Sequence, residues 1–533
     1  MTHHDADPAF MPFGRLLAEK AAAAPDREFL LFDDACITLG QLDGWTNRIA
    51  HGMQRLGLVP GSHVSVMLPN SPRWLAVFFA LQKLGICVVP INVALKGESL
   101  AYVLDHSDSV ALVIDPAYAE VLADVRERAP KIRHVIFDLA DAPEFKLPAG
   151  DLGLEEIALD DESAPDVKID PEAISGLMYT SGTTGLPKGV VMRFGNSDAR
   201  RSEPLAMMFY KEEDILYTCL PLFHANALFI SVMCALHCGG RLALGKRFSA
   251  SRFWSEARRY KATTFNALGA MIPILMKQPE KPDDVDNPVS WIISAACPAN
   301  VWEAFEKRFN LKIFEFYGAV DGGGFLTFNV GNAPVGSIGQ PPPGTVYKIA
   351  DADGNEVPLG EPGELCFKVE DQKSQGVEYY KNEKASSSKV RDGWLHTSDV
   401  VYRDEEGNLF FVDRLTDSMR RRGENVSSFE VEREVNAHPA VLESAAFGVK
   451  SDLGEDDIMV TVVRKPGEDV TPEELIAFLE KRVAKFMIPR YLDFQKLLPK
   501  TETHRVQKAE LKRQGATPET WDRENPGAKE KNS

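Results

Sequence analysis

Residues 179–189 form the segment that most constrains this chain. Four of its eleven residues carry Ser or Thr hydroxyls, three are glycines, and one is Lys188. Glycines let backbone N–H groups approach an anion closely, hydroxyls donate hydrogen bonds, and lysine adds a point charge. The apolar residues 174–178 come directly before this segment. The pattern predicts a phosphate-binding loop that follows a buried strand.

This loop differs from the common nucleotide-binding P-loop. A P-loop requires Gly-Lys followed directly by Ser or Thr. Here Pro187 precedes the lysine and Gly189 follows it. A Gly/Ser/Thr-rich run by itself is most often a flexible connection, so its function depends on motifs elsewhere in the chain.

Length and composition favour a multidomain enzyme. The chain has 533 residues, of which 44% are hydrophobic and 26% charged. No apolar run reaches the ~18 residues that a membrane span requires, and residues 1–7 lack a signal-peptide pattern. A net charge of -18 disfavours nucleic acids as partners. We therefore expect a cytoplasmic protein whose seven cysteines are reduced.

Short apolar runs alternate with helical stretches between residues 39 and 137. Such alternation predicts βαβ units around a largely parallel sheet, which is an α/β fold. The acidic, proline-containing residues 141–173 then predict a surface excursion. The expected strands are residues 64–68, 86–90, 111–114 and 134–137, and the clearest helix is 74–84.

A domain boundary is expected near residue 413, after the strand-like residues 408–412. Beyond it the pattern predicts a small α/β module, in which residues 471–474 form a helix capping box. The predicted domains are residues 1–413 and 414–533, with a hinge near 414–417 and a frayed tail from about 515. The other elements expected in the module are a helix over 429–437 and strands over 444–449 and 458–463.

The loop at 179–189 resembles the signature loop of the adenylate-forming superfamily, which includes acyl-CoA synthetases, luciferases and nonribosomal adenylation domains. Other motif regions extend the resemblance over about residues 14–511. It implies a large, multi-subdomain N-terminal AMP-binding domain and a small mobile C-terminal α/β domain. It also implies that the loop holds the β- and γ-phosphates of ATP, with Lys188 acting in catalysis as well. The loop candidates are Thr180, Ser181, Gly182, Thr183, Thr184 and Lys188.

Residues 317–321 resemble the family's Tyr-Gly-x-Thr-Glu segment, in which tyrosine stacks on adenine, threonine binds the α-phosphate and glutamate holds Mg²⁺. Here Val320 lacks the threonine hydroxyl, and Asp321 is one methylene shorter than glutamate. The resemblance makes Asp321 the metal-ligand candidate. The nucleotide-binding candidates of this region are Glu315, Phe316, Tyr317, Gly318 and Val320.

Four other stretches complete the implied nucleotide and CoA sites. Residues 294–298 resemble the small-residue segment against which adenine lies. Residues 392–399 resemble a motif whose terminal aspartate accepts both ribose hydroxyls, although Ser398 replaces its glycine. The family's boundary arginine contacts ribose and phosphates, and the loop at 423–427 matches one that closes over the thioester-forming site. The candidates are Ala295, Ala296, Cys297, Asp399, Arg414 and Gly423.

His224 and Arg505 are the remaining catalytic candidates. His224 matches a family residue that borders the acyl-carboxylate site, near which residues 267–271 and Phe325 are expected to line the acyl pocket. Arg505 stands where the family has a lysine that bridges the substrate carboxylate and the α-phosphate. Arginine keeps the charge, but its planar fork is not a point charge. Lys500 and Lys508 are the alternatives for this role.

The implied reaction has two steps. A carboxylic acid and ATP give an acyl-adenylate and diphosphate, and the CoA thiolate then gives acyl-CoA and AMP, with Mg²⁺ as the metal. Residues 423–427 and 484–489 look most like those of crotonobetaine/carnitine-CoA ligases and related acyl-CoA synthetases. The alternatives are an enzyme that loads a separate carrier protein and an ATP-binding homologue with weakened catalysis. The sequence leaves open both the acid and the oligomeric state, a homodimer being one option.

Overall fold

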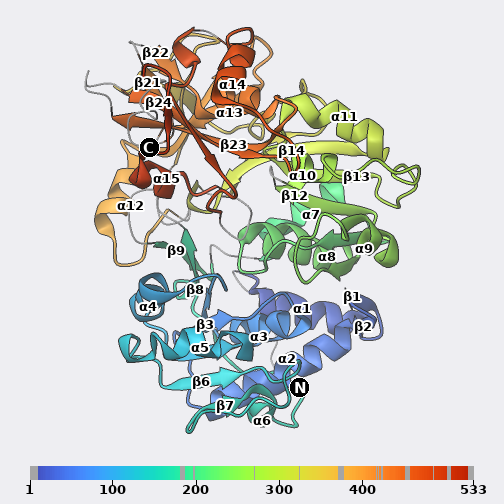
Figure 1. Cartoon of the computed structure of the whole chain (residues 1–533). Helices are drawn as coiled ribbons and strands as arrows, with labels where there is room; N and C mark the ends of the chain where they lie inside the picture. The colour runs from blue at the N-terminus through green and yellow to red at the C-terminus, as the bar shows by residue number, and fades with distance from the viewer. Residues whose placement is uncertain are drawn as a thin grey trace. The chain divides into compact units, whose positions relative to one another are not determined.

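The computed structural model describes residues 10–180, 187–195, 199–268, 271–322, 324–369, 377–415, 417, 419–421, 424–450, 456–483, 485–500 and 506–525 (Figure 1). The chain divides into two compact units. Unit 1 comprises Met1–Gly336 and Val369–Gly393, and unit 2 comprises Ser337–Lys368 and Trp394–Ser533. This division differs from the sequence-based boundary near 413, because strands on both sides of that boundary group together in unit 2.

One sheet of unit 1 contains seven strands in the order β7-β6-β5-β3-β4-β8-β9. Its strands pair in parallel, except that β8 and β9 form an antiparallel hairpin at one edge. Parallel strands need crossover connections, which the intervening helices supply. The bounds are β3 His63–Met67, β4 Cys87–Pro90, β5 Ala111–Ile114, β6 His134–Phe137, β7 Leu152–Gly153, β8 Ile174–Thr180 and β9 Lys188–Arg193.

The second sheet of unit 1 contains eight strands in the order β15-β14-β13-β12-β10-β11-β1-β2. Its interior pairs are parallel, while β15 and β2 close the two edges by antiparallel pairing. The bounds are β1 Glu28–Phe32, β2 Ala35–Thr38, β10 Ile215–Thr218, β11 Arg241–Leu244, β12 Thr264–Leu268, β13 Trp291–Ala295, β14 Lys312–Ala319 and β15 Gly324–Asn329.

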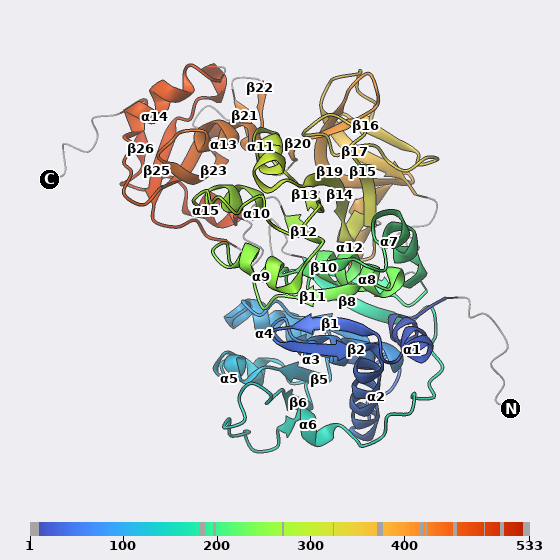
Figure 2. The same cartoon turned by 90° about the vertical axis from the view of Figure 1, so that its right-hand side faces the viewer.

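Helices α1, α2 and α3 pack on one another in unit 1 and lie beside these sheets (Figure 2). Helix α3 starts sharply because Ser71 caps its first turn and Pro72 occupies the first helical position. The helices of unit 1 are α1 Phe13–Ala23, α2 Leu39–Arg55, α3 Pro72–Lys83, α4 Gly97–His106, α5 Ala119–Ala123, α6 Leu154–Ile157, α7 Glu203–Phe209, α8 Met233–Cys238, α9 Phe253–Tyr260, α10 Met271–Met276, α11 Ala299–Phe309, α12 Glu383–Lys389 and the π-helix η4 Asn226–Val232.

Unit 2 contains three groups of strands. Strands β16, β17, β19 and β20 form an antiparallel sheet, β21 and β22 form a hairpin, and β23 to β26 form a four-stranded sheet that carries α13, α14 and α15. The strands are β16 Tyr347–Ala350, β17 Gly363–Lys368, β19 Trp394–Arg403, β20 Leu409–Arg414, β21 Met419–Arg421, β22 Glu424–Val426, β23 Val441–Lys450, β24 Asp456–Arg464, β25 Tyr491–Gln495 and β26 Trp521–Asp522. The helices are α13 Ser428–Asn436, α14 Pro472–Leu479 and α15 Lys508–Gln514.

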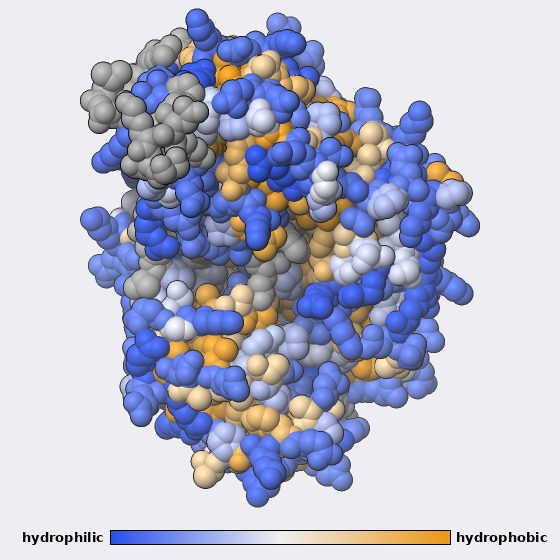
Figure 3. Space-filling view, viewed as in Figure 1, coloured by the Kyte–Doolittle hydropathy of each residue, from blue (hydrophilic) through white to orange (hydrophobic). Residues whose placement is uncertain are grey.

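Burial follows the apolar pattern of the sequence. Clusters of buried Leu, Val, Ile and Phe side chains fill the space between the sheets and helices of each unit. The face shown in Figure 3 is mainly hydrophilic, with apolar residues scattered among the polar ones. Burial of apolar surface is the main stabilising contribution to such units. The seven cysteines, all within the described residues, form no disulfide.

The predicted α/β class is confirmed, and the expected strands and helices of residues 64–137 and 429–483 are present with small shifts of their ends. Thr471 forms the predicted capping box. Residues 141–173 are more ordered than a surface excursion, because β7 and α6 lie within them. The expected frayed tail from residue 515 is not found up to residue 525. In this segment the indole N–H of Trp521 donates to Glu473, and Asp522 pairs with Arg490. None of the described helices is both long and apolar enough to cross a membrane.

Candidate active site

The expected phosphate loop connects two adjacent antiparallel strands. Strand β8 ends at Thr180 and β9 begins at Lys188, and these two residues are paired across the hairpin. The connection therefore starts and ends at one point of the sheet edge. The candidates Ser181, Gly182, Thr183 and Thr184 lie outside the described residues.

Residues 378–380 run along the open edge of β9. The N–H of Val191 donates to the carbonyl of Glu378 at 2.8 Å, and the N–H of Tyr380 donates to the carbonyl of Gly189 at 2.8 Å. The ammonium of Lys188 lies 5.4 Å from the centre of the Tyr379 ring, within the range of a cation–π contact. The segment at 378–380 is thus part of the surroundings of the phosphate loop.

Strand β14 carries the candidates from Glu315 to Gly318. Because side chains alternate between the two faces of a strand, these candidates fall into two groups. Phe314 and Phe316 face one side of the sheet, whereas Glu315 faces the other. A bulge interrupts the pairing between Tyr317 and Gly318, as is common next to functional sites. The chain then enters a short 3-10 turn that contains Val320 and Asp321.

Asp321 is held by two side chains from the 377–391 segment. The Tyr379 hydroxyl donates a hydrogen bond to Oδ2 of Asp321, and Nζ of Lys389 lies 3.3 Å from the same oxygen. Burial by itself would raise the pKa of Asp321, but Lys389 and Tyr379 outweigh that effect and lower it. Asp321 is therefore an ionised carboxylate with a cationic partner.

These contacts do not fit a divalent cation bound directly at Oδ2 of Asp321. Mg²⁺ takes carboxylate oxygens at about 2.0–2.1 Å. An ion at that distance would lie against the Lys389 ammonium, which is 3.3 Å from the same oxygen. Like charges at such a separation repel strongly in a partly buried site. Lys389 must leave before Oδ2 of Asp321 can bind a metal ion directly.

The expected adenine segment turns sharply after β13. Ala296 adopts a left-handed conformation with φ of 70°, which is unfavourable for a residue with a Cβ atom. The buried carboxyl of Glu315 accepts hydrogen bonds from the N–H groups of Ala296 and Cys297. We infer that Glu315 fixes this turn, so its contribution to nucleotide binding would pass through the backbone of residues 295–297.

Burial raises the pKa of Glu315 to about 8. Folded protein then binds a proton that unfolded protein, with an ordinary pKa of 4.5, releases. The contribution of Glu315 to the free energy of unfolding is complete below about pH 4.5. It falls as the pH rises to about 8, by at most ~1.4 kcal/mol per pKa unit. We expect the melting temperature of Glu315→Gln to depend less on pH than that of wild type between about pH 5 and 8. Thermal unfolding across a pH series measures this dependence. Parallel wild-type and variant profiles would contradict this assignment.

Asp399 and Arg414 lie opposite each other on the antiparallel strands β19 and β20. The Arg414 Nε is 3.2 Å from Oδ1 of Asp399, whose side chain is almost fully buried. A buried carboxylate paired with a guanidinium keeps a defined orientation. The structure thus brings together the two residues predicted for the ribose and its phosphates.

The backbone at Ser398, the residue before Asp399, is held by buried side chains. Ser398 has φ of 65°, where the resembling motif has glycine. Glu364 accepts the Ser398 N–H at 2.9 Å through Oε1 and contacts Nδ1 of His396 at 2.7 Å through Oε2. The Cys366 sulfur lies 3.4 Å from the same His396 nitrogen. These buried contacts hold the turn that a serine would otherwise avoid.

Gly423 and Arg505 lie outside the described residues. The two alternatives to Arg505 are already engaged in ion pairs of unit 2. Lys500 pairs with Glu443, and Lys508 lies 2.7 Å from Glu432 and also donates to Ser428. Neither lysine can serve a substrate without giving up these contacts, and Arg505 stays the prediction for this role.

His224 lies two residues before the π-helix η4, a rare conformation that frequently marks functional sites. Burial lowers its pKa to about 4, so the imidazole is neutral at physiological pH. Its Nε2 is buried and has no hydrogen-bond partner among the described residues. A neutral buried imidazole with an available nitrogen suits a contact with an uncharged or partly charged acyl oxygen better than with a carboxylate.

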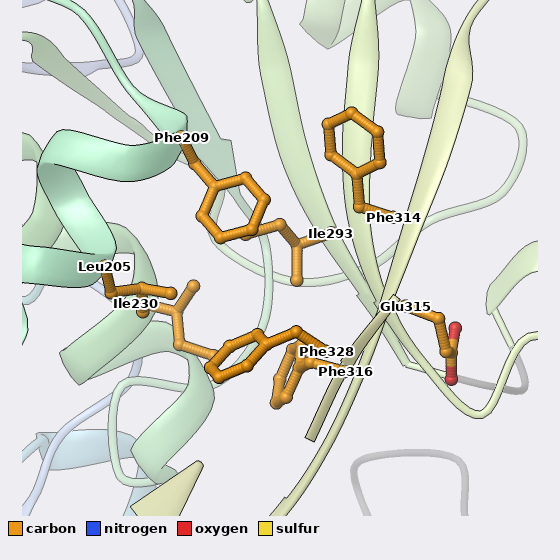
Figure 4. Close-up of a pocket in the computed structure, with 8 residues that line it drawn as sticks. All are labelled: Leu205, Phe209, Ile230, Ile293, Phe314, Glu315, Phe316 and Phe328. Atoms are coloured by element: carbon orange, nitrogen blue, oxygen red, sulfur yellow. The ribbon is translucent and has the colours of Figure 1, made fainter. Parts of the chain in front are cut away.

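An apolar pocket lies between α7, η4 and the strands β13 to β15 (Figure 4). The phenylalanine and aliphatic side chains point into it, whereas the Glu315 carboxyl points away. Phe316 lies next to Tyr317 in the chain, and Ile230 lies on the π-helix that follows His224. The lining residues are Leu205, Phe209, Ile230, Ile293, Phe314, Glu315, Phe316 and Phe328. Residues 269–270 of the expected lining lie outside the described residues, and so does the side chain of Phe325.

Sequence reasoning missed Tyr379, Lys389 and Glu364. The first two are about sixty residues beyond Asp321 in a polar stretch, and no local pattern links them to it. The doublet of tyrosines at 379–380 was the available signal, because two large aromatic residues are unusual in an otherwise charged segment. Glu364 follows a Pro-Gly turn like many surface glutamates and gave no comparable signal.

Two family models match this chain. The AMP-binding enzyme model matches residues 17–372, and the AMP-binding enzyme C-terminal domain model matches residues 430–505. The chain belongs to the AMP-binding enzyme family. The predicted architecture of a large N-terminal adenylation domain and a smaller C-terminal domain is thereby confirmed.

This AMP-binding enzyme is 31% identical over 489 residues to a crotonobetaine/carnitine–CoA ligase of Escherichia coli, covering 89% of this chain and 92% of that protein. Its fold matches an anthranilate CoA ligase in complex with anthranoyl-AMP with a TM-score of 0.85 at 23% identity, over 96% of this chain and 99% of the other. It also matches the Bacillus subtilis o-succinylbenzoate CoA synthetase bound to ATP and magnesium with a TM-score of 0.78 at 24% identity, over 93% and 99%.

Proposed function

We propose that this chain is an AMP-forming acyl-CoA synthetase, which joins a carboxylic acid to CoA through an acyl-adenylate. The observation that carries the proposal is the β8–β9 hairpin, which presents Thr180 and Lys188 at both ends of the Ser/Thr/Gly loop in a member of the AMP-binding enzyme family. The 31% identical relative is a CoA ligase, which favours CoA over a carrier protein as the acceptor.

In this proposal the chemistry is mainly the neutralisation and alignment of anions. Lys188 and the loop hydroxyls hold the β- and γ-phosphates. Tyr317 stacks on adenine beside residues 295–297, while Asp399 and Arg414 bind the ribose end. Arg505 draws the substrate carboxylate towards the α-phosphate, and diphosphate leaves as the carboxylate oxygen attacks. The CoA thiolate then attacks the acyl carbon and AMP leaves, with the loop at Gly423 closing over this step.

ATP, Mg²⁺ and CoA fit this class of enzyme, since one structural neighbour was solved with ATP and magnesium and the relative is a CoA ligase. Mg²⁺ supplies additional neutralisation of the phosphate charge when it is bound. Every other contribution named above comes from side chains and backbone groups of this chain. Cytoplasmic location and oligomeric state stay predictions.

The apolar pocket favours a carboxylic acid with a compact apolar body. Four phenylalanines and three aliphatic side chains line it, and its single carboxyl, Glu315, is turned away and has a pKa raised to about 8. A neutral pocket of this kind gains most from burying apolar surface. The cavity has a volume of about 10 Å³, close to that of one water-sized sphere, so an acid with an apolar body enters only if these side chains move.

Phe316 is expected to limit the size of that acid. Phe316→Ala removes most of a side chain that faces the pocket, so acids larger by a few carbon atoms should gain kcat/KM relative to small ones by about tenfold or more, since each methylene is worth ~1–3 kcal/mol. Competition between two acids of different size measures this ratio. Phe137→Ala, a change in a buried phenylalanine of β6 that belongs to another core cluster, is the control and should leave the ratio unchanged.

The proposed function is tested with a panel of carboxylic acids scored by diphosphate release, with and without CoA. An acyl-CoA synthetase should release diphosphate only with a suitable acid and turn over many times only with CoA. Acylation of a carrier protein without CoA turnover would instead indicate a carrier-loading enzyme. Binding of Mg-ATP without acid-dependent diphosphate release would indicate a homologue with weakened catalysis.

A further inference from the structure

We propose that Tyr179 and His106 position the phosphate loop by holding the two strand ends from which it extends. This inference rests on the proposed function, in which the loop between β8 and β9 holds the β- and γ-phosphates of ATP. Both residues belong to unit 1, as the two strands do. Neither side chain is expected to touch the nucleotide, so both are positioning residues.

The first observation is a contact between the two strands at the base of the loop. Tyr179 and Gly189 pair across the β8–β9 hairpin, one residue before Thr180 and one residue after Lys188. The Tyr179 ring lies against Gly189, because a Cβ atom added at this glycine would be only 3.1 Å from Cζ of the ring. Glycine permits this close approach. The ring therefore spans from β8 to the residue that follows Lys188.

The second observation is a hydrogen bond that fixes the outer end of this ring. The Tyr179 hydroxyl lies 2.8 Å from Nδ1 of His106, the last residue of α4. The His106 ring in turn stacks on Tyr102 of the same helix, with their centres 4.8 Å apart. Figure 1 shows α4 beside β8 and β9. The first strand end of the loop is thus tied to the C-terminal end of α4.

The third observation is that the second strand end is tied to the same place through another tyrosine. The N–H of Tyr380 donates to the carbonyl of Gly189 at 2.8 Å. The Tyr380 hydroxyl donates to Oδ2 of Asp108 at 2.6 Å, and Asp108 lies two residues after His106. Both ends of the loop are therefore held from the end of α4, one through Tyr179 and the other through Tyr380.

The pair of Tyr179 and His106 brings no charge to a phosphate. Burial, and after it the charge of Lys381, lower the pKa of His106, so the imidazole is neutral at physiological pH. Burial raises the pKa of Tyr179, which keeps its hydroxyl protonated. The effect of this pair on phosphate binding must pass through the position of the loop. A loop whose ends are already fixed loses less conformational entropy when it binds an anion.

A simpler interpretation is that these aromatic side chains only fill the core at the edge of the sheet. The rings of Tyr102, Tyr179 and Tyr380 do pack against a buried apolar cluster. Packing alone predicts that the loss of one hydroxyl lowers stability and affects the binding of every nucleotide alike. A loop that holds the β- and γ-phosphates instead distinguishes ATP from AMP, which lacks both groups. This difference gives the test.

The test compares the affinities of the full-length protein for ATP and for AMP, both with Mg²⁺, by calorimetry. Tyr179→Phe keeps the ring and removes the hydrogen bond, so ATP affinity should fall about three- to tenfold while AMP affinity stays within about twofold. His106→Leu removes the same bond and should give the same change. His106→Asn, whose amide can take the place of Nδ1, should stay near wild type. Tyr179→Leu also removes the ring and should weaken ATP binding by about tenfold or more.

Two further variants test the ring contact and provide the control. Gly189→Ala places a Cβ atom against the ring, so it should weaken ATP binding in wild type but add little to Tyr179→Leu, where that space is open. Tyr217→Phe is the matched control, because Tyr217 also packs on a glycine, Gly245, and its hydroxyl bonds Glu256 at 2.7 Å in the other sheet of unit 1. It should lower the melting temperature and leave the ratio of ATP to AMP affinity unchanged.

Three results would overturn the inference. An unchanged ratio of ATP to AMP affinity in Tyr179→Phe and His106→Leu would remove both residues from this role, and neither variant depends on whether Tyr179→Leu folds. Equal losses for the two nucleotides, together with a lower melting temperature, would indicate packing alone. The same change of ratio in Tyr217→Phe would show that any lost buried hydroxyl produces it. Wild type that binds neither nucleotide would instead refute the proposed function.

Discussion

Replacing Arg505 with alanine is expected to slow acyl-adenylate formation by about two to three orders of magnitude, which is typical for removal of one group that stabilises developing charge. Conversion of a supplied acyl-adenylate to the thioester should stay within a few-fold of wild type, because the carboxylate is already joined to the phosphate. Single-turnover measurements of diphosphate release and of thioester formation separate the two half-reactions.

Arg505→Lys restores the residue that the resembling family uses and should keep most of the adenylation rate. Lys500→Ala and Lys508→Ala are the comparisons, since both lysines are in ion pairs with Glu443 and Glu432. Equal slowing of both half-reactions in Arg505→Ala, or no slowing of either, would remove Arg505 from this role.

Replacing Asp399 with asparagine is expected to raise the KM for ATP by about ten- to a hundredfold, because two hydrogen bonds from ribose hydroxyls to a charged acceptor weaken together. The preference for ATP over 2′-deoxy-ATP and 3′-deoxy-ATP should also shrink towards one. Asparagine preserves the size of this buried side chain, and Arg414 on the facing strand remains in place.

Asp404→Asn is the matched control for this change. Asp404 lies between β19 and β20 and bonds Asn408 at 2.9 Å, so the substitution removes one carboxylate from the same hairpin at a distance from the paired Asp399 and Arg414. Its KM for ATP should match wild type. If Asp399→Asn keeps the wild-type preference for ATP over the two deoxy analogues, Asp399 does not bind the ribose hydroxyls.

Local patterns in the sequence predicted most of the secondary structure. The alternation of residues 64–137 gave β3 to β6, and the Thr-Pro-Glu-Glu signal gave the start of α14. These patterns work because helix caps and strand periodicity depend on residues close together in the chain. Strand β8 and the loop after it were also evident from composition, whereas β9 and its antiparallel pairing with β8 were not predicted.

The partners of the site residues could not be predicted in this way. Asp321 pairs with Lys389, Asp399 depends on Glu364 through Ser398, and Glu315 fixes the turn at Ala296. The last two contacts join neighbouring strands, whose proximity follows from the order of strands in a sheet, and the first joins the turn after β14 to the end of α12. The left-handed conformations of Ala296 and Ser398 were equally hidden, since neither residue type favours them.

Residues 378–380 have a consequence for anyone who shortens or recombines this protein. Strand β9 is the last strand of its sheet, and these residues pair with its outer edge from a position almost two hundred residues later. A fragment that stops before residue 378 would leave that edge unpaired, and unpaired edges invite association with other chains. Poor solubility of such a fragment would therefore reflect an uncovered strand rather than an incomplete active site.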